Sequence, residues 1–200
     1  GNPTRGYFYC YAAGTKVRRH TIQLQDVLNK RRSIRVYQSK PVEKEKIQAI
    51  IQAATLAPSW KNSQTARYYV VSGPKTLQAV KSALPEFNQK NVENVPVLIV
   101  TTFVTGRSGF GSSGDPDNEL GNGWGCYDCG LQNENLLLKA TELELSTLVM
   151  GIRDGGKLRD ILQIPDQEAV MAVIGLGYSE AAPKMPKRKR VEEIAHFFEE

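Results

Sequence analysis

One apolar segment in the second half of the chain constrains the fold most. It runs from Trp124 or Tyr127 to Leu143 without a proline, and its apolar side chains cover most of a helical surface. These side chains are Leu131, Leu136, Leu137, Leu138 and Ala140. A helix with so wide an apolar face must be buried, either at the centre of a subunit or at an interface between subunits.

Shorter runs predict a small sheet that could cover this helix. Val97 to Val100 are four consecutive apolar residues, which is typical of a strand buried on both faces. Further strands are expected at 68–71, 146–152 and 170–177. Helices are expected at 21–30, from a first turn that contains Glu43 and Glu45 to before Pro58, at 76–84, at 157–162 and from Val191.

The order of these elements indicates the fold class. Strands and helices do not alternate strictly, and no Gly-x-Gly-x-x-Gly follows a strand. The pattern predicts an α+β fold, with several helices packed on one small sheet. We expect a single domain over residues 20–200. Residues 1–19 read as an irregular N-terminal arm, or as a remnant of expression or processing.

Composition limits the partners and the compartment. The chain has 200 residues and a formal net charge of +5, which favours anionic partners without choosing among them. No apolar run approaches the roughly 20 residues of a membrane span, so we expect no membrane partner. Three cysteines do not suggest a disulfide framework. A reducing, cytoplasmic location is therefore expected.

Two basic segments are candidates for holding an anion. Arg31, Arg32, Ser33 and Arg35 follow the first predicted helix, and guanidiniums bind phosphate in a bidentate manner. The alternative is a solvated helix end, where cations offset the helix dipole. The second segment, Lys187 to Arg190, could close over the same phosphate or be a solvated tail. A nucleic-acid partner is not expected, because the chain lacks a basic recognition helix.

Two polar turns could contact a flat heterocycle. In the loop from Pro58 to Gln64, Ser59, Asn62 and Gln64 can donate and accept hydrogen bonds at once. Gly151, in the turn Met150-Gly151-Ile152, would let the backbone approach a flat ligand closely. The alternatives are an ordinary polar loop and a plain strand end. The Gly-rich stretch 106–125 predicts a long surface loop of the kind that is often functional.

Metal binding and nucleophilic catalysis are disfavoured. Cys126 and Cys129 resemble a redox or metal pair, but only one other cysteine and two histidines could complete a zinc site. Two small apolar residues on a helix face explain the same spacing. No Ser-His-Asp arrangement is evident, since His20 and His196 lie near the two ends of the chain. We name no catalytic side chain and no metal ligand.

Taken together and in this order, these segments resemble the nitroreductase family of flavin enzymes. The matching segments are 31–37, 57–64, 133–140, 149–152, 174–178 and the basic run followed by 191–194. The resemblance covers about residues 22–200. It implies an α+β nitroreductase-like fold, with a small mixed or antiparallel sheet packed by helices. It also implies a domain-swapped type of homodimer with FMN in pockets at the interface.

The resemblance further implies which residues hold FMN. Those implied for the phosphate and ribityl chain are Arg31, Arg32, Ser33, Arg35, Arg188 and Arg190, with Lys187 as the alternate. Those implied for the isoalloxazine are Pro58, Ser59, Asn62 and Gln64, partly from the partner subunit, together with Asn88 near its polar edge. Met150, Gly151 and Ile152 would contribute backbone contacts over the ring.

The activity implied is electron transfer from NAD(P)H through FMN to nitroaromatic, quinone or similar small acceptors, by a ping-pong mechanism. Two alternatives stay open. One is a flavin enzyme of the same fold with another reaction, such as dehalogenation or flavin fragmentation. The other is a basic binding module without a cofactor.

The chain departs from the family pattern at two places. Thr65 and Ala66 stand where many members have Pro and an aromatic residue, which widens the pocket or shifts the start of the next strand. Glu144 stands where the family often has Gly, at a predicted helix end.

Overall fold

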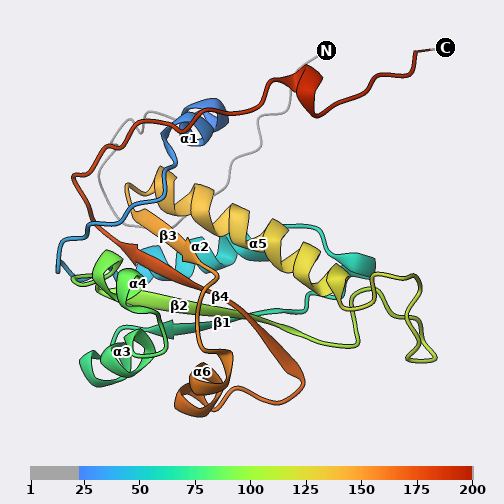
Figure 1. Cartoon of the computed structure of the whole chain (residues 1–200), viewed down its shortest axis with the longest axis horizontal. Coiled ribbons are helices and arrows are strands. Elements are labelled where there is room, and N and C mark those ends of the chain that lie inside the picture. The colour runs from blue at the N-terminus through green and yellow to red at the C-terminus, as the bar shows by residue number, and fades with distance from the viewer. Residues whose placement is uncertain (1–22, 200) are drawn as a thin grey trace, which may run out of the picture.

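A computed structural model describes residues 23–199 and shows one four-stranded sheet (Figure 1). Its strands are β1 (Ala66–Val71), β2 (Val97–Val104), β3 (Ser146–Met150) and β4 (Glu168–Gly177). They lie in the order β1-β2-β4-β3, and each neighbouring pair is antiparallel. The predicted small sheet of this kind is therefore confirmed, with β3 as one edge strand.

Helices cover both faces of the sheet (Figure 1). On one face lie α2 (Lys44–Thr55) and the long α5 (Gly123–Glu142). On the other lie α3 (Pro74–Lys81), α4 (Glu86–Asn91) and α6 (Gly155–Leu162). The short α1 (Leu24–Lys30) packs near α5, and the predicted start of this helix at Thr21 lies outside the described residues, as does the arm at 1–19.

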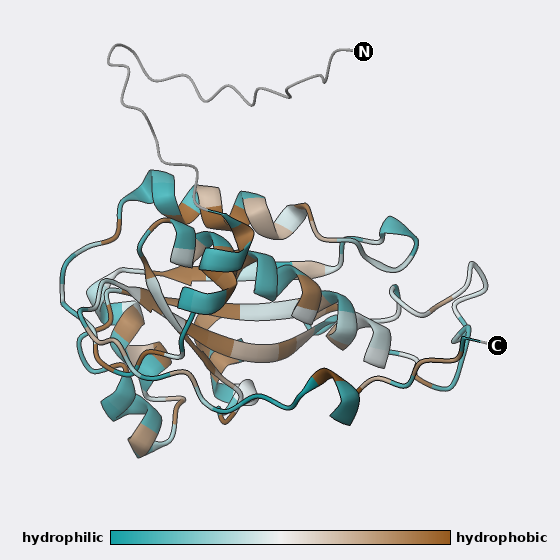
Figure 2. Cartoon of the chain, turned by 90° about the horizontal axis from the view of Figure 1, so that it is seen from above, coloured by the Kyte–Doolittle hydropathy of each residue, from teal (hydrophilic) through white to brown (hydrophobic). Residues whose placement is uncertain are grey.

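The two cores meet at β2, because successive residues of a strand point to opposite faces. Val97 and Ile99 pack with α2 and α5, whereas Leu98 and Val100 pack with α3 and α6. All four side chains are buried. In Figure 2 the strands are largely hydrophobic, and the helices that cover them turn hydrophilic residues outward. A strand covered on both faces is what the unbroken apolar run predicted.

Of the two positions expected for the long apolar helix, the structure shows the centre of the subunit. Leu136 and Ala140 are fully buried against the sheet, and Leu137 is nearly so. Just after the helix, Glu144 has a φ of 61°. This left-handed conformation at a helix C-terminus is commonly adopted by glycine, so the structure explains why the family often has Gly there.

Two expectations for the helices were wrong. The chain forms α4 at Glu86–Asn91, which has no apolar period and was not predicted. Its buried residue is a polar one, Asn88. The helix expected from Val191 is only a single 3-10 turn, Val191–Glu193. Val191 and Ile194 are largely exposed, so no packing supports a longer helix there.

Candidate functional site

The basic segment after α1 is hydrogen-bonded to the outer edge of β3. Ser33 forms a parallel bridge with Thr147, and the Ile34 N–H donates to the Thr147 carbonyl at 2.9 Å. Ile34 is buried, whereas its neighbours Ser33 and Arg35 are exposed. The alternation of an extended chain thus presents the hydroxyl and the guanidinium on the outer side.

The arginines of this segment have no carboxylate partner among residues 23–199. Arg35 Nη1 donates to the Ser33 carbonyl at 3.4 Å, and Arg32 Nη1 donates to the Arg31 carbonyl at 2.7 Å. None of the ion pairs in that part of the chain involves Arg31, Arg32 or Arg35. The segment therefore carries net positive charge that an anionic ligand could neutralise.

A pocket of about 450 Å³ lies behind the segment. Lys30, Arg31 and Arg32 line it together with Thr141 and Glu144, which lie at the carboxyl end of α5. A helix C-terminus and a nearby carboxylate both disfavour an anion. The outer face with Ser33 and Arg35 is the better place for a phosphate, and Arg32 faces the pocket instead.

The other end of β3 carries the predicted backbone contacts. Gly151 and Ile152 follow the strand and are exposed, and a Cβ added at Gly151 would meet no atom within 4 Å. Asn88 from α4 lies beside them, and its Nδ2 donates to the Ile152 carbonyl at 3.5 Å. Thr147 and Ile152 are five residues apart, about 17 Å of extended chain. The basic segment, this open turn and Asn88 thus adjoin one edge strand.

The loop from Pro58 to Gln64 lies elsewhere, next to the start of α5. The Trp60 N–H donates to Asp128 Oδ2 at 2.9 Å, and the Trp60 and Trp124 rings are 4.7 Å apart. Asn62 and Gln64 are exposed. Both have a positive φ, 53° and 50°, a strained conformation that tends to occur at functional sites.

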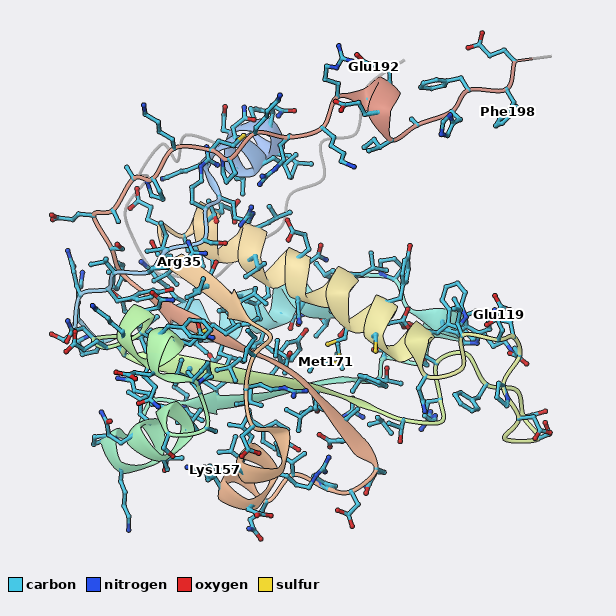
Figure 3. All side chains as sticks on the ribbon, viewed as in Figure 1. Arg35, Glu119, Lys157, Met171, Glu192 and Phe198 are labelled. Atoms are coloured by element: carbon cyan, nitrogen blue, oxygen red, sulfur yellow. The ribbon has the colours of Figure 1, made fainter. Side chains whose placement is uncertain are left out.

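One subunit therefore does not bring the predicted site together. Asp128 and Thr141 lie at the two ends of α5, 13 positions or about 20 Å apart. The loop at 58–64 contacts the first end and the basic segment adjoins the second. In Figure 3, Arg35 and Glu119 mark these opposite ends of the molecule.

The C-terminal basic residues lie on an exposed, extended tail. Arg188 Nη1 donates to the Pro186 carbonyl, and Arg190 pairs with Glu192 and Glu193. In the described part of the chain, no hydrogen bond or ion pair joins Lys187, Arg188 or Arg190 to the segment at 31–35. Their contact with FMN remains a prediction.

The cysteine pair behaves as packing rather than as a site. Cys126 is exposed and its Sγ lies 3.8 Å from Met171 Sδ, whereas Cys129 is buried. Burial raises the pKa of the Cys129 thiol to about 11. Within residues 23–199 no group of three or more His, Cys, Asp or Glu is placed to hold a metal ion. The helices of that same range include none long and apolar enough to cross a bilayer.

Sequence reasoning missed two buried polar residues, Asp128 and Ser108. Asp128 accepts from the Trp60 N–H and from Ser108 Oγ, and Ser108 also contacts Ser63 and Thr65. The available signal was an acidic residue four and eight positions before Gln132 and Leu136, which places it on the face of the helix that is buried. A buried carboxylate needs partners, and here the partners come from the loop.

Solved structures identify the class of fold. The chain is 27% identical to an enzyme of Parabacteroides distasonis provisionally named NADH dehydrogenase/NAD(P)H nitroreductase, with a TM-score of 0.73 over 88% of this chain and 98% of that one. A protein of Exiguobacterium sibiricum, provisionally named a nitroreductase, was solved in complex with FMN. It also has a TM-score of 0.73, at 21% identity, over 89% of this chain and 98% of that one. The second likeness shows the fold alone. The fold is that of the nitroreductases.

The sequence identifies the family. Residues 28–178 match the family model described as "Nitroreductase family", and the chain belongs to that family. A protein of Archaeoglobus fulgidus, provisionally named NADH dehydrogenase/NAD(P)H nitroreductase, is 32% identical over 74% of this chain and 80% of its own length. Iodotyrosine deiodinase 1 of Rattus norvegicus is 25% identical, over 90% of this chain and 70% of its own length. The predicted family, fold and enzyme class are confirmed, and FMN is confirmed as the cofactor at the level of the family.

Proposed function

We propose that two copies of this chain form an NAD(P)H-dependent FMN oxidoreductase. The observation that carries the proposal is the exposed basic segment on the edge of β3, which has no carboxylate partner among the described residues. An edge strand with free cations and an open turn at its far end suits a ligand that is anionic at one end and flat at the other.

Different residues of this chain contact the phosphate and the ring of that ligand. Ser33 and Arg35 bind the phosphate on the outer side of the segment. Gly151 and Ile152 offer backbone to the ring, and Gly151 has no side chain that would keep the ring away. Asn88 supports this turn through its hydrogen bond to the Ile152 carbonyl. FMN, when bound, supplies the hydride-accepting ring, and the protein supplies its orientation.

The second half of the site comes from the partner. In one subunit the loop at 58–64 and the basic segment adjoin opposite ends of α5, so the loop would contact the same flavin across a dimer interface. Asn62 and Gln64 would then meet the ring from the partner subunit. Lys187, Arg188 and Arg190 on the exposed tail would add positive charge to a phosphate site.

The proposed reaction is reduction of nitroaromatic or quinone acceptors in two half-reactions at one ring face. NAD(P)H binds and leaves before the acceptor binds. Trp60 and Trp124 form an aromatic wall beside the exposed Asn62 and Gln64, which suits planar acceptors. A second candidate is reductive dehalogenation, which the similarity to iodotyrosine deiodinase favours.

Flavin reconstitution tests the proposal. The protein incubated with FMN and freed of excess ligand should be yellow, and anaerobic NADH or NADPH should bleach the band. A nitroaromatic or a quinone should then restore the colour. Release of iodide from iodotyrosine by the prereduced protein, without reoxidation by nitro compounds, would favour the second candidate. A colourless protein that neither retains FMN nor oxidises NAD(P)H would overturn both.

A further inference from the structure

One carboxylate fastens the Pro58–Gln64 loop to the protein core. Asp128 lies in the second turn of α5 and is only 2% exposed. Its Oδ2 accepts from the Trp60 N–H at 2.9 Å and from Ser108 Oγ at 2.7 Å. Trp60 begins the 3-10 turn Trp60–Asn62, so the carboxylate satisfies an N–H that no helical partner can satisfy.

The same carboxylate sets the direction of three hydroxyls. A serine hydroxyl has one proton, and Ser108 gives it to Asp128, which as a carboxylate can only accept. Ser63 Oγ, at 2.6 Å, and Thr65 Oγ1, at 3.3 Å, must therefore donate to Ser108. Asp128 thus fixes the loop at its beginning, through Trp60, and at its end, through Ser63 and Thr65.

The loop needs this support because its own conformation is strained. Lys61, Asn62 and Gln64 all have a positive φ, and such residues persist where surrounding structure holds them. The bonds within the loop are local: the Asn62 N–H donates to the Ser59 carbonyl at 3.0 Å, and the Ser63 N–H donates to the Trp60 carbonyl at 2.8 Å. Gln64 adds two more, from its N–H to Ser59 Oγ at 3.1 Å and from its Nε2 to the Asn62 carbonyl at 3.5 Å, and none of the four joins the loop to the core. The ion pair of Lys61 with Asp117 is exposed and contributes little.

Thr65 is a part of this network that the many family members with Pro at this position would lack. It is 1% exposed, and it stands where the resemblance placed Pro in many family members. A proline there could not donate the hydroxyl bond to Ser108. The departure noted in the sequence is therefore part of the network.

We propose that Asp128 is a positioning residue that holds Asn62 and Gln64 in the conformation that contacts FMN. This inference rests on the proposed function, because it takes the loop to be a flavin contact. Asp128 itself lies beneath the loop and reaches the ligand only through Trp60, Ser63 and Thr65.

The chain offers a matched control in Glu168. This carboxylate is 7% exposed, and its Oε2 accepts from Tyr69 OH at 2.8 Å and from Thr102 Oγ1 at 2.6 Å. It lies at the start of β4 on the α6 side of the sheet, and it makes no bond to the loop. Glu168→Ala and Asp128→Ala each remove a buried acceptor of two hydrogen bonds, so both should lower the melting temperature.

Tryptophan spectroscopy of the apoprotein and FMN titration separate the two variants. The chain has two tryptophans, Trp60 and Trp124, and their rings are in contact. Asp128→Ala should change the near-ultraviolet circular dichroism and increase acrylamide quenching, and should weaken FMN binding by about tenfold relative to Glu168→Ala. Asp128→Asn retains an accepting oxygen, so it should restore the spectrum and most of the affinity.

The outcomes distinguish this inference from the function on which it rests. A wild type that binds no FMN would show the proposed function to be wrong. A wild type that binds FMN, with Asp128→Ala matching Glu168→Ala in both tryptophan signal and FMN affinity, would overturn the positioning role alone. A melting temperature lowered equally in both variants, with the spectrum and affinity changed only in Asp128→Ala, is the expected result.

Discussion

Arg35→Ala is expected to weaken FMN binding by about 100-fold, which corresponds to about 2.7 kcal/mol. The exposed guanidinium on the edge of β3 has no carboxylate partner in residues 23–199, and its only hydrogen bond there is a long one to the Ser33 carbonyl. A phosphate on this side would therefore gain most of its charge-assisted contacts from this side chain and its neighbours. The dissociation constant can be measured from the quenching of FMN fluorescence.

Two further variants test whether a lower FMN affinity of Arg35→Ala comes from the loss of the Arg35 guanidinium. Lys75→Ala removes one positive charge from α3, a helix that contacts β2 rather than the edge strand β3, and should leave the affinity within about twofold of the wild type. Arg35→Lys keeps the charge but not the bidentate geometry, and should fall between the wild type and Arg35→Ala. Equal affinities for Arg35→Ala and Lys75→Ala would show that the phosphate is bound elsewhere.

Gly125→Ala is expected to lower the free energy of unfolding by about 2 to 3 kcal/mol. Gly125 lies in the first turn of α5, and a Cβ there would come within 2.3 Å of Phe103 Cδ2 and Cε2. Phe103 is a buried residue of β2, so its ring cannot move aside without disturbing the core. Either the start of α5 or the ring must shift, and urea denaturation measures the cost.

Gly130 provides the control within the same helix. A Cβ at Gly130 would meet no atom within 4 Å, and alanine favours a helix more than glycine does. Gly130→Ala should therefore raise the free energy of unfolding by about 0.5 to 1 kcal/mol. A Gly125→Ala variant as stable as the wild type would refute the close packing of α5 on β2.

The parts of the fold that sequence reasoning predicted are those where burial follows a period. The buried strand at 97–100 and the long helix ending near Leu143 each carry an apolar pattern that only one kind of packing satisfies. Helix α4 has no such pattern, because its buried side chain is Asn88, which bonds to the distant Ile152 carbonyl. The tail after Arg190 has apolar residues but nothing in the described subunit to bury them.

The sequence nominates residues for the candidate site, whose contacts with FMN stay predictions, but it does not show how those residues are assembled. Basic, amide and glycine residues can be recognised one by one, since their chemistry is local. That the segment at 31–35 and the loop at 58–64 lie at opposite ends of α5 depends on contacts far apart in the sequence, such as Trp60 with Asp128. The buried network of Asp128 and Ser108 was missed for the same reason.

If each flavin is held by two copies of the chain, two variants that are defective in different parts of the site should complement each other in one dimer. One variant carries Arg35→Ala with an intact loop, and the other carries Asn62→Ala and Gln64→Ala with an intact Arg35. Each alone should bind FMN poorly. After the two are unfolded and refolded together, hybrid dimers should regain one flavin site of wild-type affinity, because one intact loop meets one intact basic segment. FMN binding that stays as weak in the mixture as in the separate variants would contradict a site shared between subunits.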